Sequence, residues 1–251
     1  MPRFFVRQDA VLDGRICLRG EDAHHIARSL RMAVGDGLTV CDMQGNEYDC
    51  RIEAFADDRE VTVTVDAVRA PQNEPPCRIR LFQALPKGDK LETVIQKAVE
   101  CGVSEIVPFE SERCVVRVKP EAEARKTERR QRIASEAAKQ CGRSILPEVR
   151  ESVSFSEMLR LAGESELCLF CYEGEGTLPL GAVLKEHEAL LREGCRVSVI
   201  IGSEGGFSIP ESEEIRAAGM TAVGLGKRIL RTETAPIFVL SCLSYATELG
   251  G

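Results

Sequence analysis

Long hydrophobic runs are missing from this sequence of 251 residues. None approaches the roughly 20 consecutive apolar residues that a membrane-spanning helix needs. The first residues, MPRFFVRQD, also lack the apolar stretch of a secretory signal peptide. With 43% hydrophobic and 29% charged residues, the composition is that of a globular protein and not of a disordered or fibrous one. We therefore expect a cytoplasmic protein that has no membrane partner.

Histidine is scarce, with three residues in the chain, and Cys-x-x-Cys occurs once, at Cys168 and Cys171. No second such pair and no nearby histidine completes a zinc site. Positions three apart on a strand point to opposite faces, so we expect these two thiols to be core residues. The eleven cysteines are scattered and odd in number, which favours reduced thiols over a disulfide framework. The sequence predicts no metal site.

The net charge of −7 argues against a nucleic-acid partner, but the charge is unevenly distributed. Residues 113–150 contain 11 Lys or Arg against 5 Glu, whereas residues 151–193 contain 3 basic against 9 acidic residues. Solvated helix faces produce the same asymmetry. The charge pattern therefore permits an RNA partner without requiring one.

The first seventy residues predict a small antiparallel β unit. The segments FFV, LTVCD, YDCRIEAF and EVTVTVDAV have the alternation and the flanking turns of short strands, and one helix is expected at residues 21–30. The following segment, APQNEPP, disfavours both helix and sheet because of its prolines. We place a linker at residues 71–76, between domains of residues 1–70 and 77–251.

Beyond the linker, apolar strands alternate with helices. The strands are IRLFQAL, SEIVPF, LCLFCY, RVSVIIG and TAVGLG, and helices are expected at residues 89–101, 210–218 and 234–249. This order is typical of an α/β fold with a parallel sheet covered on both faces. Ligands of such sheets bind beyond the carboxyl ends of the strands. The loops after LFQAL, LFCY, VIIG and VGLG are therefore the places to look for a site.

Three of these loops are rich in glycine: EGEG, IGSEGGF and GLGKRILRTET. Glycine permits positive φ and close approach of a ligand to the main chain, although tight turns use it equally. A P-loop needs Gly-Lys-Ser/Thr, which IGSEGGF lacks. A dinucleotide fingerprint needs a third glycine where Ile229 stands. With both motifs excluded, the remaining possibility is a different kind of adenosine-binding pocket, built from backbone amides.

Two of the loops carry a family resemblance. IGSEGGF followed by LGKRILRTETAP resembles the cofactor-binding half of the SPOUT methyltransferases. The resemblance extends to LFQALPKGDKLETVIQKAVECGVSEIVPF, ERCVVR, EAAKQCGRSILPEV and HIARSLRMAVGD. Together these motifs span most of the chain and resemble the RsmE family. One departure is Ser203, where that family usually has proline.

The resemblance implies a SPOUT-type α/β fold with a carboxyl-terminal trefoil knot, preceded by a PUA-like β-barrel that binds RNA. It implies a homodimer whose active sites borrow residues from the partner. The implied activity is S-adenosylmethionine-dependent methylation of N3 of a specific uridine in 16S ribosomal RNA of the small ribosomal subunit. The helical spacing of Val239, Leu240, Leu243 and Ala246 predicts an apolar face, which we expect to pack against the partner.

The resemblance also implies roles for single residues. Arg143 is the preferred catalytic or substrate-orienting residue, because a guanidinium can bind phosphate or stabilise a deprotonated uracil. Glu204 and Glu233 are candidate bases, although carboxylates beside a helix start also act as caps. The expected RNA contacts are Arg28, Arg31, Arg113 and Arg143. The expected cofactor contacts are Tyr172, Ile201, Gly202, Glu204, Gly205, Gly206, Leu225, Gly226, Arg228, Ile229, Leu230 and Thr232.

Two alternatives belong to other functional classes. One is a SPOUT enzyme that modifies transfer RNA, and the other is a non-catalytic RNA-binding assembly factor. A Rossmann-type oxidoreductase is disfavoured because its glycine fingerprint is missing.

Overall fold

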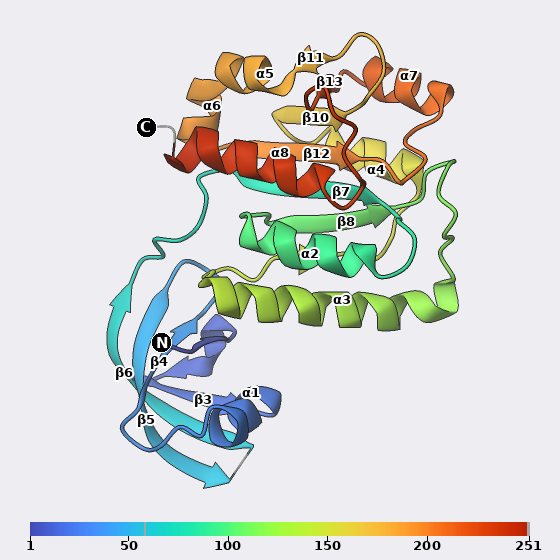
Figure 1. The fold of residues 1–251 in the computed structure, drawn as a ribbon. Helices are drawn as coiled ribbons and strands as arrows, with labels where there is room; N and C mark the ends of the chain where they lie inside the picture. The colour runs from blue at the N-terminus through green and yellow to red at the C-terminus, as the bar shows by residue number, and fades with distance from the viewer. Residues whose placement is uncertain (58, 250–251) are drawn as a thin grey trace. The chain divides into compact units, whose positions relative to one another are not determined.

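The computed structural model describes residues 1–57 and 59–249 of the chain (Figure 1). The chain divides into two compact units. The first contains Met1–Glu74 together with Ala138–Leu146, and the second contains Pro75–Ala137 together with Pro147–Gly251. The sequence analysis divided the chain only at residues 71–76. It did not predict that Ala138–Leu146, far along the chain, would belong to the first unit.

A six-stranded sheet forms the first unit, in the order β1-β4-β5-β6-β3-β2. The β1–β4 pairing is parallel, and the pairings of the other neighbours are antiparallel. Three register shifts between β5 and β6 bend this long hairpin, because a bulge adds a residue to one strand only. The strands are β1 (Arg3–Phe5), β2 (Val11–Leu12), β3 (Arg15–Arg19), β4 (Gly37–Cys41), β5 (Glu47–Asp57) and β6 (Glu60–Arg69).

Alternating burial along these strands creates the core of the first unit. Ile16 and Leu18 of β3 and Val61 and Val63 of β6 are buried, whereas their neighbours in sequence are more exposed. The helix expected at residues 21–30 forms as α1 (Glu21–His24), which continues into a π-helical turn, η2 (His25–Ser29). The short 3₁₀ turn η1 (Gln8–Ala10) and the strands β2 and β3 were not predicted from the sequence.

The segment Ala138–Leu146 is held in the first unit by charged groups. Glu47, which is 3% exposed, accepts hydrogen bonds from Arg3 and from the hydroxyl of Ser144. Lys139 Nζ lies 2.6 Å from Asp22 Oδ1. Because buried carboxylates are costly unless paired, these contacts fix where the segment lies.

A seven-stranded parallel sheet forms the second unit, in the order β11-β13-β10-β12-β7-β8-β9. The central strands are almost continuously buried, as expected for a sheet with helices on both faces. The strands are β7 (Arg78–Ala84), β8 (Glu105–Phe109), β9 (Glu148–Val149), β10 (Leu167–Cys171), β11 (Leu178–Pro179), β12 (Arg196–Ile201) and β13 (Thr221–Gly224).

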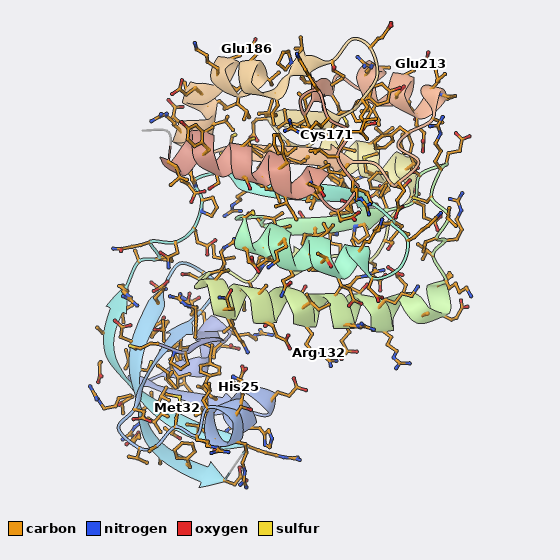
Figure 2. All side chains as sticks on the ribbon, viewed as in Figure 1. His25, Met32, Arg132, Cys171, Glu186 and Glu213 are labelled. Carbon is orange, nitrogen blue, oxygen red and sulfur yellow. The ribbon has the colours of Figure 1, made fainter. Side chains whose placement is uncertain are left out.

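Helices cover both faces of this sheet. Figure 1 shows α2 and α8 side by side in front of it, while α4 packs against β7, β8 and β12 from behind. Exposed carboxylates such as Glu186 of α5 and Glu213 of α7 point outwards, whereas Cys171 lies among the strands (Figure 2). The helices are α2 (Lys90–Glu100), α3 (Pro120–Cys141), α4 (Phe155–Ala162), α5 (Leu180–Glu186), α6 (Glu188–Glu193), α7 (Ile209–Ala217) and α8 (Ala235–Ser244), followed by the π-helical turn η3 (Tyr245–Leu249).

The apolar face predicted for the last helix is buried within its own chain. Val239, Leu240 and Leu243 are each 0% exposed, because α8 packs against β12 and α2. The expectation that Leu243 packs against a partner subunit is therefore wrong. Phe238 and Tyr245 are the more exposed side chains of this region, at 38% and 65%.

Strand order brings the glycine-rich loops together. β13, β10 and β12 are neighbours and run parallel, so their carboxyl ends lie at one edge of the sheet. The loop after β12 ends where α7 begins, at a capping box in which Ser208 and Glu211 exchange side-chain and backbone hydrogen bonds. This cap fixes the point at which the loop IGSEGGF gives way to helix.

Candidate active site

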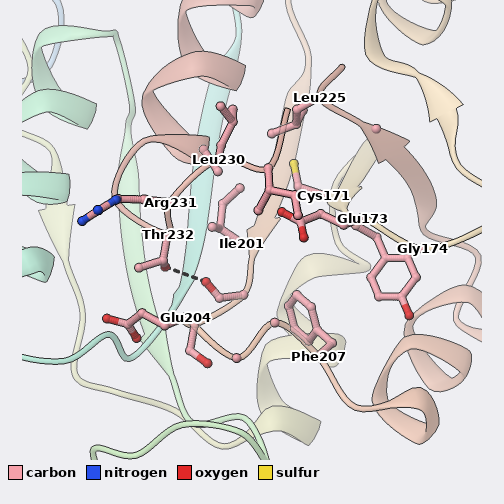
Figure 3. A pocket seen from close by; sticks show the side chains of 18 of the residues that line it. Cys171, Glu173, Gly174, Ile201, Glu204, Phe207, Leu225, Leu230, Arg231 and Thr232 are labelled. Carbon is pink, nitrogen blue, oxygen red and sulfur yellow. Dashed lines mark hydrogen bonds between the residues drawn. The ribbon is translucent and has the colours of Figure 1, made fainter. Parts of the chain in front are cut away.

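A cavity of about 760 Å³ opens at the carboxyl ends of β10, β12 and β13 (Figure 3). Its volume falls within the roughly 300–1,000 Å³ of small-molecule sites. All three glycine-rich loops line it. The twelve residues expected to contact a cofactor all lie in its lining: Tyr172, Ile201, Gly202, Glu204, Gly205, Gly206, Leu225, Gly226, Arg228, Ile229, Leu230 and Thr232.

Two glycines in the lining are required by their surroundings. A Cβ on Gly202 would lie 2.9 Å from the ring of Phe207 and 3.2 Å from Gly206 Cα, which is too close for a real contact. Gly226 has a φ of +102°, a conformation that side chains other than hydrogen rarely adopt. Because neither position tolerates a side chain, the main chain itself forms the wall of the cavity there.

Hydrogen bonds tie the loop after β12 to the loop after β13. Thr232 Oγ1 donates to the carbonyl of Gly202 at 2.7 Å. Gln83, a fully buried residue of β7, donates through Nε2 to Thr232 Oγ1 at 3.0 Å and to the Gly202 carbonyl at 3.3 Å. These three residues therefore hold the two loops in a fixed relation, as Figure 3 shows for the Thr232 bond.

The two candidate bases, Glu204 and Glu233, both contact the side chain of Lys90. Lys90 Nζ lies 3.0 Å from Glu204 Oε1 and 3.3 Å from Glu233 Oε2, and the Lys87 amide donates to Glu204 at 3.1 Å. Burial raises the pKa of Glu204, but the hydrogen bonds from Lys90 and from backbone amides outweigh burial and place this pKa below its ordinary value. Glu204 is therefore a carboxylate at neutral pH. Its hydrogen bond in turn raises the pKa of Lys90.

The arginines expected to contact RNA lie in both units. Arg113 lines the cavity, and its Nη1 donates to the carbonyl of Gly205 at 2.9 Å. Arg28, Arg31 and Arg143 belong to the first unit. Arg143 is 4% exposed, and its guanidinium donates through Nε and Nη2 to Glu74. The roles expected for these arginines stay predictions.

Comparison with known proteins decides the family. A sequence model described as RNA methyltransferase domain matches residues 73–244, and one described as RNA methyltransferase PUA domain matches residues 18–66. The ribosomal RNA small subunit methyltransferase E of Bacillus subtilis is 33% identical over 99% of this chain and 98% of its own length. The chain belongs to the RsmE family. The Synechocystis member is 32% identical over 98% of this chain and 78% of its own length.

Solved structures agree with this assignment. The RsmE protein of Neisseria gonorrhoeae, bound to S-adenosylmethionine, matches 98% of each chain with a TM-score of 0.85 and 28% identity. A Legionella pneumophila protein, also in complex with that cofactor, matches 98% of each chain with a TM-score of 0.82 and 31% identity. The fold of this RsmE-family chain is therefore a SPOUT-type α/β domain with a PUA-like amino-terminal domain.

The structure of this RsmE-family chain places at the cavity or its loops several residues that the sequence did not assign to the site, among them Lys90, Cys171 and Gln83. Lys90 and Cys171 line the cavity, and Gln83 ties two of its loops together. Cys171 was expected in the core, but it stands at the last position of β10, where the strand meets the cavity (Figure 3). Lys90 lies just after the loop that follows the strand LFQAL, which is the one candidate loop without a glycine-rich motif. Its position beyond the carboxyl end of a strand was the sequence feature that could have identified it as a site residue.

Proposed function

We propose that this protein uses S-adenosylmethionine to methylate N3 of a specific uridine in 16S ribosomal RNA. The observation that carries the proposal is the full-length similarity to ribosomal RNA small subunit methyltransferase E of Bacillus subtilis, joined to a cavity at the edge where the family's motifs meet. S-adenosylmethionine-bound relatives share the fold over nearly the whole chain.

The cavity fits such a cofactor. Its volume is large enough for an adenosine-sized ligand, and its glycines at 202 and 226 leave the main chain uncovered by side chains. Ser203 Oγ and Gln83 Oε1 are buried and have no hydrogen-bond partner among the described residues. Buried polar atoms are usually satisfied, so the hydroxyl of Ser203, which lines the cavity, is suited to a bound polar group.

The reaction requires that the N3 proton be accepted and that the two reactants be aligned, and different residues of the cavity are proposed for these two tasks. The cofactor supplies an electrophilic methyl group, and the N3 proton of uracil must leave as the new bond forms. Glu204, ionised and held by Lys90, and Glu233, which contacts the same lysine, are the two proposed acceptors of that proton. The loops fixed by Thr232 and Gln83 orient the reactants, and alignment alone contributes up to roughly 7–11 kcal/mol to lowering a barrier.

Further features of the proposal concern assembly. We propose a homodimer in which a partner subunit completes each active site, and a trefoil knot in which the carboxyl-terminal segment threads through a loop. Domains of residues 1–70 and 77–251 are part of the same proposal, as is catalysis without a metal. We also propose that the protein works in the cytoplasm, where ribosomal RNA is modified. In the described chain, helices long and apolar enough to cross a membrane are absent.

A methyl-transfer assay tests the activity. Incubation with labelled S-adenosylmethionine and small ribosomal subunits from cells lacking this protein is expected to label 16S RNA, and mass mapping is expected to place the methyl group on N3 of one uridine. Calorimetry is expected to show the same affinity for S-adenosylmethionine with and without EDTA, since no metal is part of the proposed site. Label in transfer RNA instead would favour the alternative SPOUT enzyme, and no turnover on any RNA would favour the assembly factor.

Thr232→Val tests the bond between the two cofactor loops. Valine keeps the shape of threonine but leaves the Gly202 carbonyl without its strongest donor. A lost hydrogen bond of this kind costs about 1–3 kcal/mol, so we expect calorimetry to show about tenfold weaker binding of S-adenosylmethionine. Thr234→Val, two positions along at an exposed site, is the control and should bind normally. Equal affinities for both variants would contradict this role of Thr232.

A further inference from the structure

Three cations on the loop between β13 and α8 lie together at the cavity without an acidic partner in the part of the chain that the structure describes. Lys227, Arg228 and Arg231 are exposed and line the cavity. Among the described residues, none of the three makes an ion pair or a side-chain hydrogen bond. Figure 3 shows the side chain of Arg231 pointing away from Ile201 and Leu225. Arg113, on the same cavity, is held by a neutral carbonyl and keeps its charge uncompensated.

The basic stretch at residues 113–150 differs from this loop because most of its cations have acidic partners. Within residues 113–150, most cations are already engaged inside the chain: Arg129 with Glu92, Arg130 with Glu123, Arg132 with Glu128, Lys139 with Asp22, Arg143 with Glu74 and Arg150 with Glu105. A cation paired with a carboxylate contributes little to attracting an anion. The local excess of basic residues in this stretch therefore overstates its capacity to bind RNA.

We propose that Lys227, Arg228 and Arg231, with Arg113, form a phosphate-binding rim that docks the RNA backbone beside the target nucleotide. Free cations in a chain of net charge −7 mark a place where an anion is expected, since unpaired charges at one cavity focus an attractive field. Phosphate contacts position a nucleic acid without reading its sequence. This inference rests on the proposed function, because it supplies the substrate-binding surface for that reaction.

The cofactor is a poorer occupant for this rim. S-adenosylmethionine carries a positive sulfonium, an ammonium group and one carboxylate, so it can neutralise at most one of the cations, and Arg228 is the one expected to contact the cofactor. A stretch of RNA offers one phosphate per nucleotide and matches several cations spaced along a loop. Ile229, between Arg228 and Leu230, is 82% exposed and offers an apolar surface beside these cations.

A double variant tests the rim without touching the residues expected to bind the cofactor. Lys227→Ala/Arg231→Ala is compared with Arg125→Ala/Lys126→Ala, which removes the same charge from exposed positions of α3 that do not line the cavity. Binding of a short synthetic single-stranded RNA is measured by fluorescence anisotropy over a range of salt concentrations. Each lost phosphate contact lowers the slope of log K against log salt by about 0.7.

The rim variant is expected to bind RNA about tenfold more weakly at physiological salt, with a slope shallower by about 1.4, while the α3 variant keeps the wild-type slope. Calorimetry is expected to show wild-type affinity of the rim variant for S-adenosylmethionine, which would establish that this variant is folded. Wild-type RNA affinity in the rim variant, equal losses in both variants, or a matching loss of cofactor affinity would overturn the proposal. Because binding is measured without catalysis, an absence of methyl transfer would refute the proposed function separately.

Discussion

Leu243→Asp is expected to prevent the second unit from folding. Leu243 is 0% exposed, on the face of α8 that packs against the sheet. Loss of a buried leucine side chain costs about 2–5 kcal/mol, and burial of a carboxyl group without a partner adds several more. The sum is comparable to the roughly 5–15 kcal/mol by which a whole domain is stable. Circular dichroism should show a loss of the cooperative thermal transition of this unit.

Phe238→Asp is the matched control on the same helix. Phe238 is 38% exposed, so the carboxylate can remain in water and the thermal transition should be nearly unchanged. If the proposed homodimer uses this face, sedimentation should show a folded monomer for Phe238→Asp. A Leu243→Asp protein as stable as the wild type would contradict the burial that the structure assigns to this residue.

Arg143→Ala is expected to destabilise the first unit strongly. Arg143 is 4% exposed, and its guanidinium is bound through Nε and Nη2 to Glu74, at 2.9 and 2.7 Å from Oε2. Removal of one partner leaves a carboxylate with poor access to water, which typically costs about 3–5 kcal/mol. The amides of Ser144 and Ile145 also donate to Glu74 and will offset part of this loss. Thermal unfolding measures the effect.

Glu74→Gln separates the structural role of Arg143 from the catalytic role expected for it. This variant weakens the same contact but keeps the guanidinium. Methyl transfer is compared at a temperature at which both variants are folded. A loss of turnover in Arg143→Ala that Glu74→Gln does not share would support a catalytic role, whereas parallel losses would assign Arg143 to structure. An unchanged melting temperature in Arg143→Ala would contradict the importance of the ion pair.

The parallel sheet could be predicted because its signals are local. Continuous apolar segments such as RVSVIIG become β12, and IGSEGGF marks the loop that follows. The family motifs identified the lining of the cavity for the same reason, since each loop is short and contiguous. Short exposed elements such as β2 had no comparable pattern, because two residues are too few to show alternation.

Contacts between distant parts of the chain could not be predicted in this way. Gln83 gives no local sign of its partner, which is Thr232, 149 positions away. The return of Ala138–Leu146 to the first unit depends on carboxylates at positions 47 and 74 that lie far from it in sequence. Periodicity describes which face of an element is apolar but not which polar side chain will meet it.

The bond between Gln83 and Thr232 also has a consequence for biosynthesis. Gln83 lies in the first strand of the second unit, whereas Thr232 is near the carboxyl terminus. Domains generally form as their residues leave the ribosome, yet this cavity lacks one wall until the last segment has emerged. A nascent chain that ends before residues 224–232 therefore lacks part of the cavity lining. Stabilisation by the cofactor is expected only after this segment has joined the second unit.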